Sequence, residues 1–157
     1  NGVIPMGAVA VKEEIYDTVM DAAPKGAVEL FHGYTYSGIP CAVAAALAVQ
    51  NIFEKEDIFK RSKEMSSYFL DGIFSLKDLN GIDNIRGYGM MAGIDMKLKE
   101  KPGRAGFECF KACYDAGVNF KATGDCLIIA PQFICEKKHI DEIIEKLRTG
   151  ISNYMKK

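Results

Sequence analysis

The sequence predicts an α/β to α+β fold, in which helices pack on a small sheet with an antiparallel component. Several segments of the 157-residue chain carry apolar residues at spacings of three and four, the period of an amphipathic helix. Short apolar and β-branched runs lie between those segments, and glycine-containing turns join neighbouring runs. Hydrophobic residues make up 48% and charged residues 26% of the chain, which is typical of a globular protein.

The first third of the chain predicts short elements around a long loop. Residues 3–11 are mostly apolar and end in β-branched residues, which favours a buried strand. Residues 12–20 are polar with one apolar side, which indicates a short surface helix. Proline and glycine recur through residues 21–39, so we expect a loop there. A loop of that length inside a compact domain is often functional.

Two consecutive helices are expected next. Residues 40–53 are alanine-rich and apolar nearly all round, the pattern of a helix buried on most faces. Pro40 suits the first turn of this helix, where its missing N–H group costs nothing. The second helix has one face with members at spacings of three and four: Ile58, Ser62, Met65, Phe69, Ile73 and Leu76.

The last part of the chain alternates strands and helices. Residues 82–86 and 90–96 predict one pair of strands, and residues 118–122 and 126–130 predict another. A helix is expected between the two pairs, and a further helix at the C-terminus, from residue 136 to about 154. Their expected apolar faces are, respectively, Phe107, Phe110 and Tyr114, and Ile140, Ile143, Ile144, Leu147 and Ile151.

Charge and cysteine content exclude several classes of partner. The 20 basic and 21 acidic residues give a net charge of −1, so the chain has no excess of positive charge to attract nucleic acid or an anionic membrane. The longest apolar run, residues 39–49, is well short of the roughly 20 residues that a membrane-spanning helix needs. Five cysteines inside apolar patterns are typical of a reducing compartment, so we expect a cytoplasmic protein.

No metal site or catalytic constellation is expected from residue spacing. Cys109 and Cys113 share a helix face, but a zinc site needs about four ligands. The two histidines, His32 and His139, have no matching spacing, so we interpret the cysteine pair as core. No Ser-His-Asp, Cys-His or paired-carboxylate pattern can be assembled either.

Residues 31–40, with the sequence Phe-His-Gly-Tyr-Thr-Tyr-Ser-Gly-Ile-Pro, carry the strongest functional signal. Glycine lets backbone amides approach an anion, threonine and serine hydroxyls donate hydrogen bonds, and a helix N-terminus favours negative charge. These groups together suit a phosphate. The alternative is a loop that only caps the helix after it, and spacing alone does not separate the two.

This segment resembles the phosphate-contacting loop of the class III pyridoxal-phosphate aminotransferases of the ω-amino acid or β-alanine:pyruvate type. Three further motifs agree in order and spacing. Residues 2–9 resemble the stretch after the family's Schiff-base lysine, residues 86–95 its Arg-Gly-x-Gly strand pair, and residues 122–131 its Gly-Asp strand. The resemblance covers essentially the whole chain.

The resemblance implies roles for individual residues. Thr35 matches the threonine that donates to the cofactor phosphate in the neighbouring subunit's site, and Tyr34 matches the aromatic position that lines the same pocket. Arg86 matches an arginine that we interpret as structural, held by carbonyl or carboxylate contacts. Lys121 stands where many members have an arginine that binds the substrate carboxylate; lysine keeps the charge but lacks the bidentate fork. A solvated lysine at a strand end is the alternative for Lys121.

The resemblance also implies a fold-type I architecture and an activity. Residues 1–54 would be the C-terminal remnant of a large cofactor-binding domain, and residues 55–157 the small C-terminal domain. The enzyme would be a homodimer with its site at the subunit interface. It would use pyridoxal phosphate to move an amino group from an ω-amino acid or amine to pyruvate or another oxo acid.

The family's Schiff-base lysine would lie just upstream of Asn1, so we expect no catalytic residue in this chain and no activity of the chain alone. Two alternatives stay open for the function. One is another class III enzyme, such as an ornithine or diamine aminotransferase, an aminomutase or a decarboxylase. The other is a non-catalytic oligomerisation module.

Overall fold

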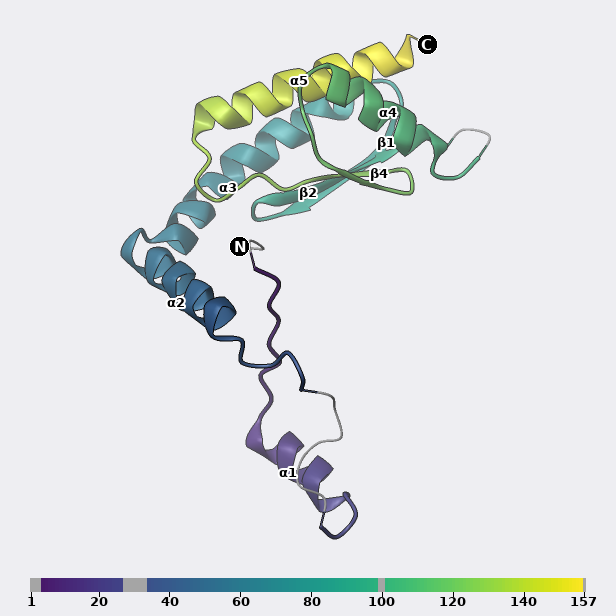
Figure 1. Cartoon of the computed structure of the whole chain (residues 1–157). Coiled ribbons are helices and arrows are strands. Elements are labelled where there is room, and N and C mark those ends of the chain that lie inside the picture. Colours follow the sequence, from purple (N-terminus) through teal and green to yellow (C-terminus); the bar gives the residue numbers. More distant parts are fainter. Residues whose placement is uncertain (1–3, 27–33, 99–100, 157) are drawn as a thin grey trace. The chain divides into compact units, whose positions relative to one another are not determined.

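The computed structural model describes residues 4–26, 34–98 and 101–156. The chain divides into two compact units, Asn1–Lys55 and Glu56–Lys157, which we describe separately (Figure 1). No helix in the described ranges combines the length and the apolar character that crossing a membrane requires.

The first unit holds two helices, α1 (Glu13–Asp21) and α2 (Pro40–Lys55). Both were predicted, and α1 is the expected surface helix because none of its residues is buried. The prediction that α2 is buried on most faces is wrong, since Ala42 is its one buried residue. The apolar surface of α2 is therefore not covered by the described residues of its own unit.

The predicted strand at residues 3–11 is also not formed in its described part. Residues 5–12 have no regular secondary structure, and Val9 is 90% exposed. A strand requires a neighbour to pair its backbone N–H and C=O groups, and the described residues of this unit form no strand. Apolar composition alone therefore overestimated the order of this segment.

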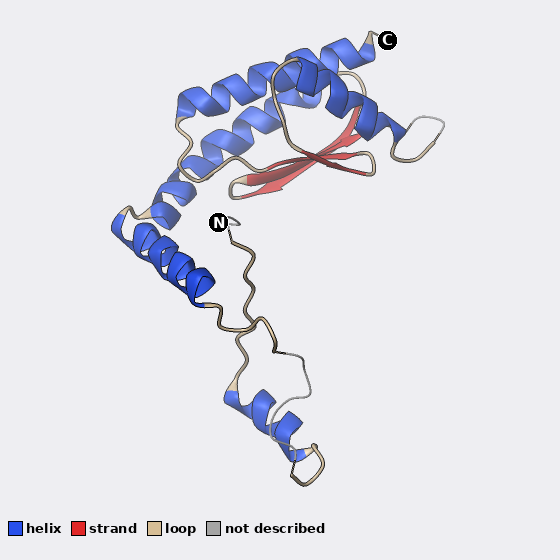
Figure 2. Ribbon diagram, in the orientation of Figure 1, coloured by secondary structure: helices blue, strands red, loops and turns tan. Residues whose placement is uncertain are grey.

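The second unit is an α+β layer structure, as predicted. Its elements are α3 (Ile58–Phe74), the 3₁₀ helix η1 (Ser75–Asp78), β1 (Ile82–Tyr88), β2 (Met91–Met96), α4 (Arg104–Asp115), β3 (Lys121–Thr123), β4 (Cys126–Ile129) and α5 (Lys137–Met155). The strands form one antiparallel sheet in the order β1-β2-β4-β3. The three helices lie on one side of this sheet (Figure 2).

The core of this unit lies between the helices and the sheet. Its largest fully buried side chains come from the three helices, η1 and the strands: Phe69, Ile73, Leu76, Ile94, Met96, Cys109, Cys113, Leu127, Ile140, Leu147 and Ile151. The apolar faces expected for α3 and α5 thus supply the helical side of the core. Side chains alternate between the two faces of a strand, so one face of the sheet presents apolar residues to these helices.

Helix α4 buries a different face from the aromatic one that we predicted. Phe107 and Tyr114 are 60% and 61% exposed. The buried residues are small: Ala105, Gly106, Cys109, Ala112 and Cys113. Small side chains let α4 approach the β3–β4 turn and α5 so closely that large ones would not fit, as the contacts of Gly106 and Gly150 show. The interpretation of Cys109 and Cys113 as core residues is confirmed.

Candidate functional site

A hydroxyl-bearing turn leads into α2, where the sequence predicted a phosphate-binding loop. Residues 35–38 form the turn, and the Ser37 N–H group donates to the Tyr34 carbonyl at 3.0 Å. Gly38 has φ of +68°, a left-handed conformation that few other residues adopt without strain. Residues 31–33 of the predicted loop lie outside the described residues.

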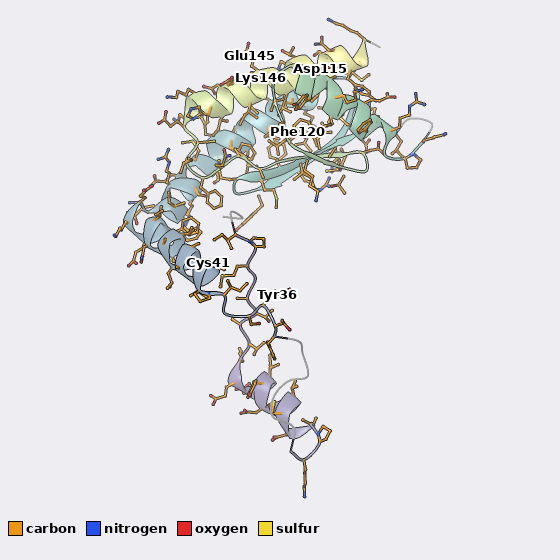
Figure 3. All side chains as sticks on the ribbon, in the orientation of Figure 1. Tyr36, Cys41, Asp115, Phe120, Glu145 and Lys146 are labelled. Atoms are coloured by element: carbon orange, nitrogen blue, oxygen red, sulfur yellow. The ribbon has the colours of Figure 1, made fainter. Side chains whose placement is uncertain are left out.

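The turn presents its polar groups to the outside. Thr35 and Tyr34 are both exposed, and Tyr36 is labelled in Figure 3 beside the start of α2. No hydrogen bond from the Thr35 hydroxyl to another residue is found in the part of the chain that the structure describes. A threonine hydroxyl, a serine hydroxyl and the backbone at Gly38 directly before a helix are a donor set that fits a phosphate.

The second candidate site is the face of the sheet opposite the helices of its unit, called here the helix-free face. The strand register places four residues in one row across this face, from β1 to β3: Arg86, Gly93, Ile128 and Lys121. Residues directly opposite each other on paired strands point to the same side of a sheet. A shallow pocket lies on this face, lined by Arg86, Tyr88, Met91, Gly93, Cys126 and Ile128.

Arg86 is held within the sheet by its neighbours, as its structural interpretation predicted. Its guanidinium donates to the Asp95 carboxylate on β2 and, at 3.4 Å, contacts the Cys126 Sγ atom on β4. Partial burial raises the pKa of Asp95, but hydrogen bonds from Arg86 and Cys126 outweigh it and leave this pKa below its ordinary value. The Arg86 charge is therefore already paired.

Cys126 is not set up as a nucleophile. Burial, followed by the hydrogen bond and charge of Asp95, raises the pKa of its thiol above the ordinary value. A raised pKa keeps the sulfur protonated at neutral pH, whereas reactive cysteines have a lowered pKa. Cys126 therefore serves as packing and as a contact for Arg86.

Lys121 is the one lysine of the row and lies on β3, an edge strand of three residues. Its side chain is exposed, and among the described residues no ion pair or hydrogen bond to it is found. The row therefore ends in one paired cation, Arg86, and one cation without such a pairing, Lys121. An anion that reaches the helix-free face would be attracted by Lys121 rather than by Arg86.

Asp125 is a residue whose role the sequence reasoning missed. It lies in the β3–β4 turn, and its carboxylate accepts hydrogen bonds from the Gly103 and Gly106 N–H groups at 2.7 and 3.0 Å. These two backbone hydrogen bonds hold the pKa of Asp125 below its ordinary value. The missed signal was that the N-cap position before α4 is Gly103, which has no side chain to cap the helix, so the cap must come from elsewhere.

The fold matches part of the fold of known transaminases. A solved structure described as a transaminase variant with SMBA superposes with a TM-score of 0.84 at 24% identity, over 93% of this chain and 36% of that chain. An adenosylmethionine-8-amino-7-oxononanoate aminotransferase from Methanocaldococcus jannaschii superposes with a TM-score of 0.73 at 30% identity, over 80% of this chain and 30% of its own.

The sequence comparison leads to one family. The chain belongs to the aminotransferase class-III family, whose profile matches residues 1–151. It is 39% identical over 149 residues to an omega-aminotransferase from Caulobacter vibrioides, a match that covers 94% of this chain and 34% of the relative. It is 34% identical over 154 residues to a beta-alanine–pyruvate aminotransferase from Pseudomonas aeruginosa, covering 97% of this chain and 34% of the relative. The chain thus spans about a third of the length of these relatives.

Proposed function

We propose that this chain is the C-terminal part of a pyridoxal-phosphate-dependent aminotransferase that moves an amino group from an ω-amino acid or amine to pyruvate or another oxo acid. The observation that carries the proposal is the family match over residues 1–151, which includes the turn at Thr35 and the strand of Lys121. Residues 1–54 would belong to the large cofactor-binding domain and residues 55–157 would form the small domain.

Thr35 and Tyr34 are proposed to hold the cofactor. The Thr35 hydroxyl would donate to the phosphate, together with backbone amides of the turn before α2, and the exposed Tyr34 ring would line the same pocket. When bound, pyridoxal phosphate supplies an electron-withdrawing ring that makes the substrate proton beside the amino group removable. In a homodimer, the Thr35 turn would serve the site of the neighbouring subunit.

Lys121 is proposed to bind the substrate carboxylate. Support comes from its exposed position on the helix-free face and from the pairing of Arg86 with Asp95, which leaves Lys121 to attract the anion. The chain is also 33% identical to a putrescine–pyruvate aminotransferase from Pseudomonas aeruginosa, so a diamine donor is the second candidate. A diamine would bring a second cation toward Lys121, and like charges repel, which favours the carboxylate-bearing donor.

We propose further that catalysis requires residues outside this chain, because the family resemblance assigns the Schiff-base bond to the cofactor to no residue of this chain. The chain spans about a third of its curated relatives, and that third would supply binding groups only. A cytoplasmic location is proposed as well, because the five cysteines lie inside apolar patterns of the sequence, as is typical of proteins from a reducing compartment.

The Thr35 assignment is tested by cofactor affinity. In the enzyme that contains this chain, Thr35→Val should weaken pyridoxal-phosphate binding about 10- to 100-fold, since a hydrogen bond to a charged group contributes about 1.5–3 kcal/mol. Thr35→Ser should keep most of the affinity because it retains the hydroxyl. The dissociation constant is measured by absorbance titration of the cofactor-free enzyme.

Thr18→Val provides the matched control for this titration. Thr18 lies in α1 of the same unit, and its hydroxyl donates a hydrogen bond to the Glu14 carbonyl one turn earlier. It should leave cofactor binding unchanged. If Thr35→Val bound the cofactor as tightly as this control, Thr35 would not be a phosphate ligand.

A further inference from the structure

The edge strand β3, which carries Lys121, is attached to α4 at both of its ends. On one side of Lys121 lies Phe120, which is labelled in Figure 3. Its ring packs edge-on against Phe110 of α4, with ring centroids 5.5 Å apart. On the other side, Asp125 accepts hydrogen bonds from the N–H groups of Gly103 and Gly106 at the start of α4. Lys121 therefore stands between an aromatic contact and a carboxylate contact to the same helix.

The carboxylate contact is specific in its geometry. The Asp125 carbonyl accepts from the Met96 N–H group at 2.9 Å, so this residue also joins the turn to the end of β2. Gly106 lies directly against the turn, and a Cβ atom there would collide with the Gly124 carbonyl oxygen. A carboxylate at a helix N-terminus is stabilised by the free N–H groups and by the helix dipole.

A short edge strand depends on such contacts for its position. The strand β3 has three residues and a hydrogen-bonded neighbour on one side only, β4. Its backbone pairing alone is too limited to fix a long lysine side chain against a small ligand, because binding geometry is sensitive to displacements of about 1 Å. The contacts to α4 supply the missing constraint.

We propose that Asp125 is a positioning residue for Lys121: by capping α4, it fixes the β3–β4 turn and thereby sets where Lys121 meets the substrate carboxylate. The proposal rests on the carboxylate role of Lys121 proposed above. Asp125 touches neither substrate nor cofactor. It determines specificity, because a displaced Lys121 penalises donors with a carboxylate and leaves donors without one unaffected.

The test compares two donors in the holoenzyme that contains this chain. The donor half-reaction is followed in a single turnover without an oxo-acid acceptor, by measuring the oxo product that the donor leaves behind. The two donors are β-alanine and 1-phenylethylamine, which has no carboxylate. Asp125→Asn keeps the side-chain shape but loses one acceptor. It should raise the half-saturating β-alanine concentration about tenfold, with the maximal rate and both parameters for 1-phenylethylamine unchanged.

Three further variants sharpen the comparison. Asp115→Asn, at the opposite end of α4 (Figure 3), is the same substitution at an exposed aspartate and should change nothing. Phe120→Leu loosens the aromatic contact while keeping an apolar side chain, and should give the same donor-selective loss in case Asp125→Asn folds poorly. The double variant Asp125→Asn/Lys121→Gln should be no worse for β-alanine than Lys121→Gln alone.

The outcomes distinguish a failure of the positioning role of Asp125 from a failure of the proposed carboxylate-binding role of Lys121. If Lys121→Gln reduces β-alanine binding selectively while Asp125→Asn and Phe120→Leu do not, the positioning role is wrong and the carboxylate role stands. Equal losses for both donors, or losses that multiply in the double variant, also contradict positioning. If Lys121→Gln itself leaves β-alanine binding unchanged, the proposed role of Lys121 fails, and the role of Asp125 fails with it.

Discussion

Replacing Gly150 by alanine is expected to destabilise the Glu56–Lys157 unit by about 3 kcal/mol. Gly150 lies in α5 where that helix meets α4, and an added Cβ atom would stand 2.5 Å from the Cys113 Cα atom and 2.9 Å from its backbone nitrogen. Backbone atoms cannot rotate away as a side chain can. The two helices would have to separate, which would disturb the core beneath them. Urea unfolding followed by circular dichroism measures the loss.

Gly72→Ala is the matched control, because it is the same substitution within α3. There the added Cβ atom would meet the Ile144 side chain at 3.0 and 3.3 Å, and that side chain can move. The gain in helix propensity, about 1 kcal/mol, should offset this contact and leave stability unchanged or slightly higher. Equal stability of the two variants would mean that α4 and α5 do not pack as closely as the structure has them.

Replacing Lys121 by glutamine is expected to weaken the binding of β-alanine by about 10- to 100-fold, because a hydrogen bond to a charged group contributes about 1.5–3 kcal/mol. The paired Arg86 cannot substitute, since its guanidinium already neutralises Asp95. Lys121→Arg should bind β-alanine at least as tightly as the native enzyme, because a guanidinium adds a second parallel hydrogen bond to a carboxylate. Binding of 1-phenylethylamine, which lacks a carboxylate, should be unaffected.

The control for Lys121 is Lys111→Gln, which removes one exposed lysine from α4 and lowers the net charge equally. It should leave the half-saturating concentrations of both donors unchanged. A loss of β-alanine binding in both variants would indicate a general effect of charge. No loss in Lys121→Gln would make Lys121 the solvated strand-end lysine that was the alternative interpretation.

Much of the second unit could be predicted from the sequence, because periodicity reports which side of an element is buried. The faces of α3 and α5 were found in this way, since their large apolar residues are also the core residues. The face of α4 was not, because its buried side is defined by small residues such as Gly106 and Cys113. Hydrophobic periodicity weights large side chains, whereas close helix packing selects small ones.

The first unit was harder to predict for a different reason. Residues 5–12 have strand-like composition, but a strand depends on pairing with distant segments, and the described part of this unit provides none. The same physics limited the prediction of the candidate sites. Residue type and motif indicated Thr35, Arg86 and Lys121, whereas the contacts of Arg86 with Asp95 and Cys126 follow from strand register. Register between strands cannot be deduced from local pattern alone.

A subunit-complementation experiment addresses the proposal that Thr35 would bind the cofactor phosphate in the neighbouring subunit's site, whereas Lys121 would bind the substrate carboxylate in the site of its own subunit. Thr35→Val and Lys121→Gln enzymes are each impaired, and the two are mixed under conditions that exchange subunits. In a mixed dimer, one site would then carry both substitutions and the other neither. The mixture is expected to regain amino transfer from ¹⁵N-labelled β-alanine to pyruvate, well above either parent enzyme. A mixture that forms mixed dimers but stays as impaired as its parents would mean that Thr35 and Lys121 do not serve the sites of different subunits in this way.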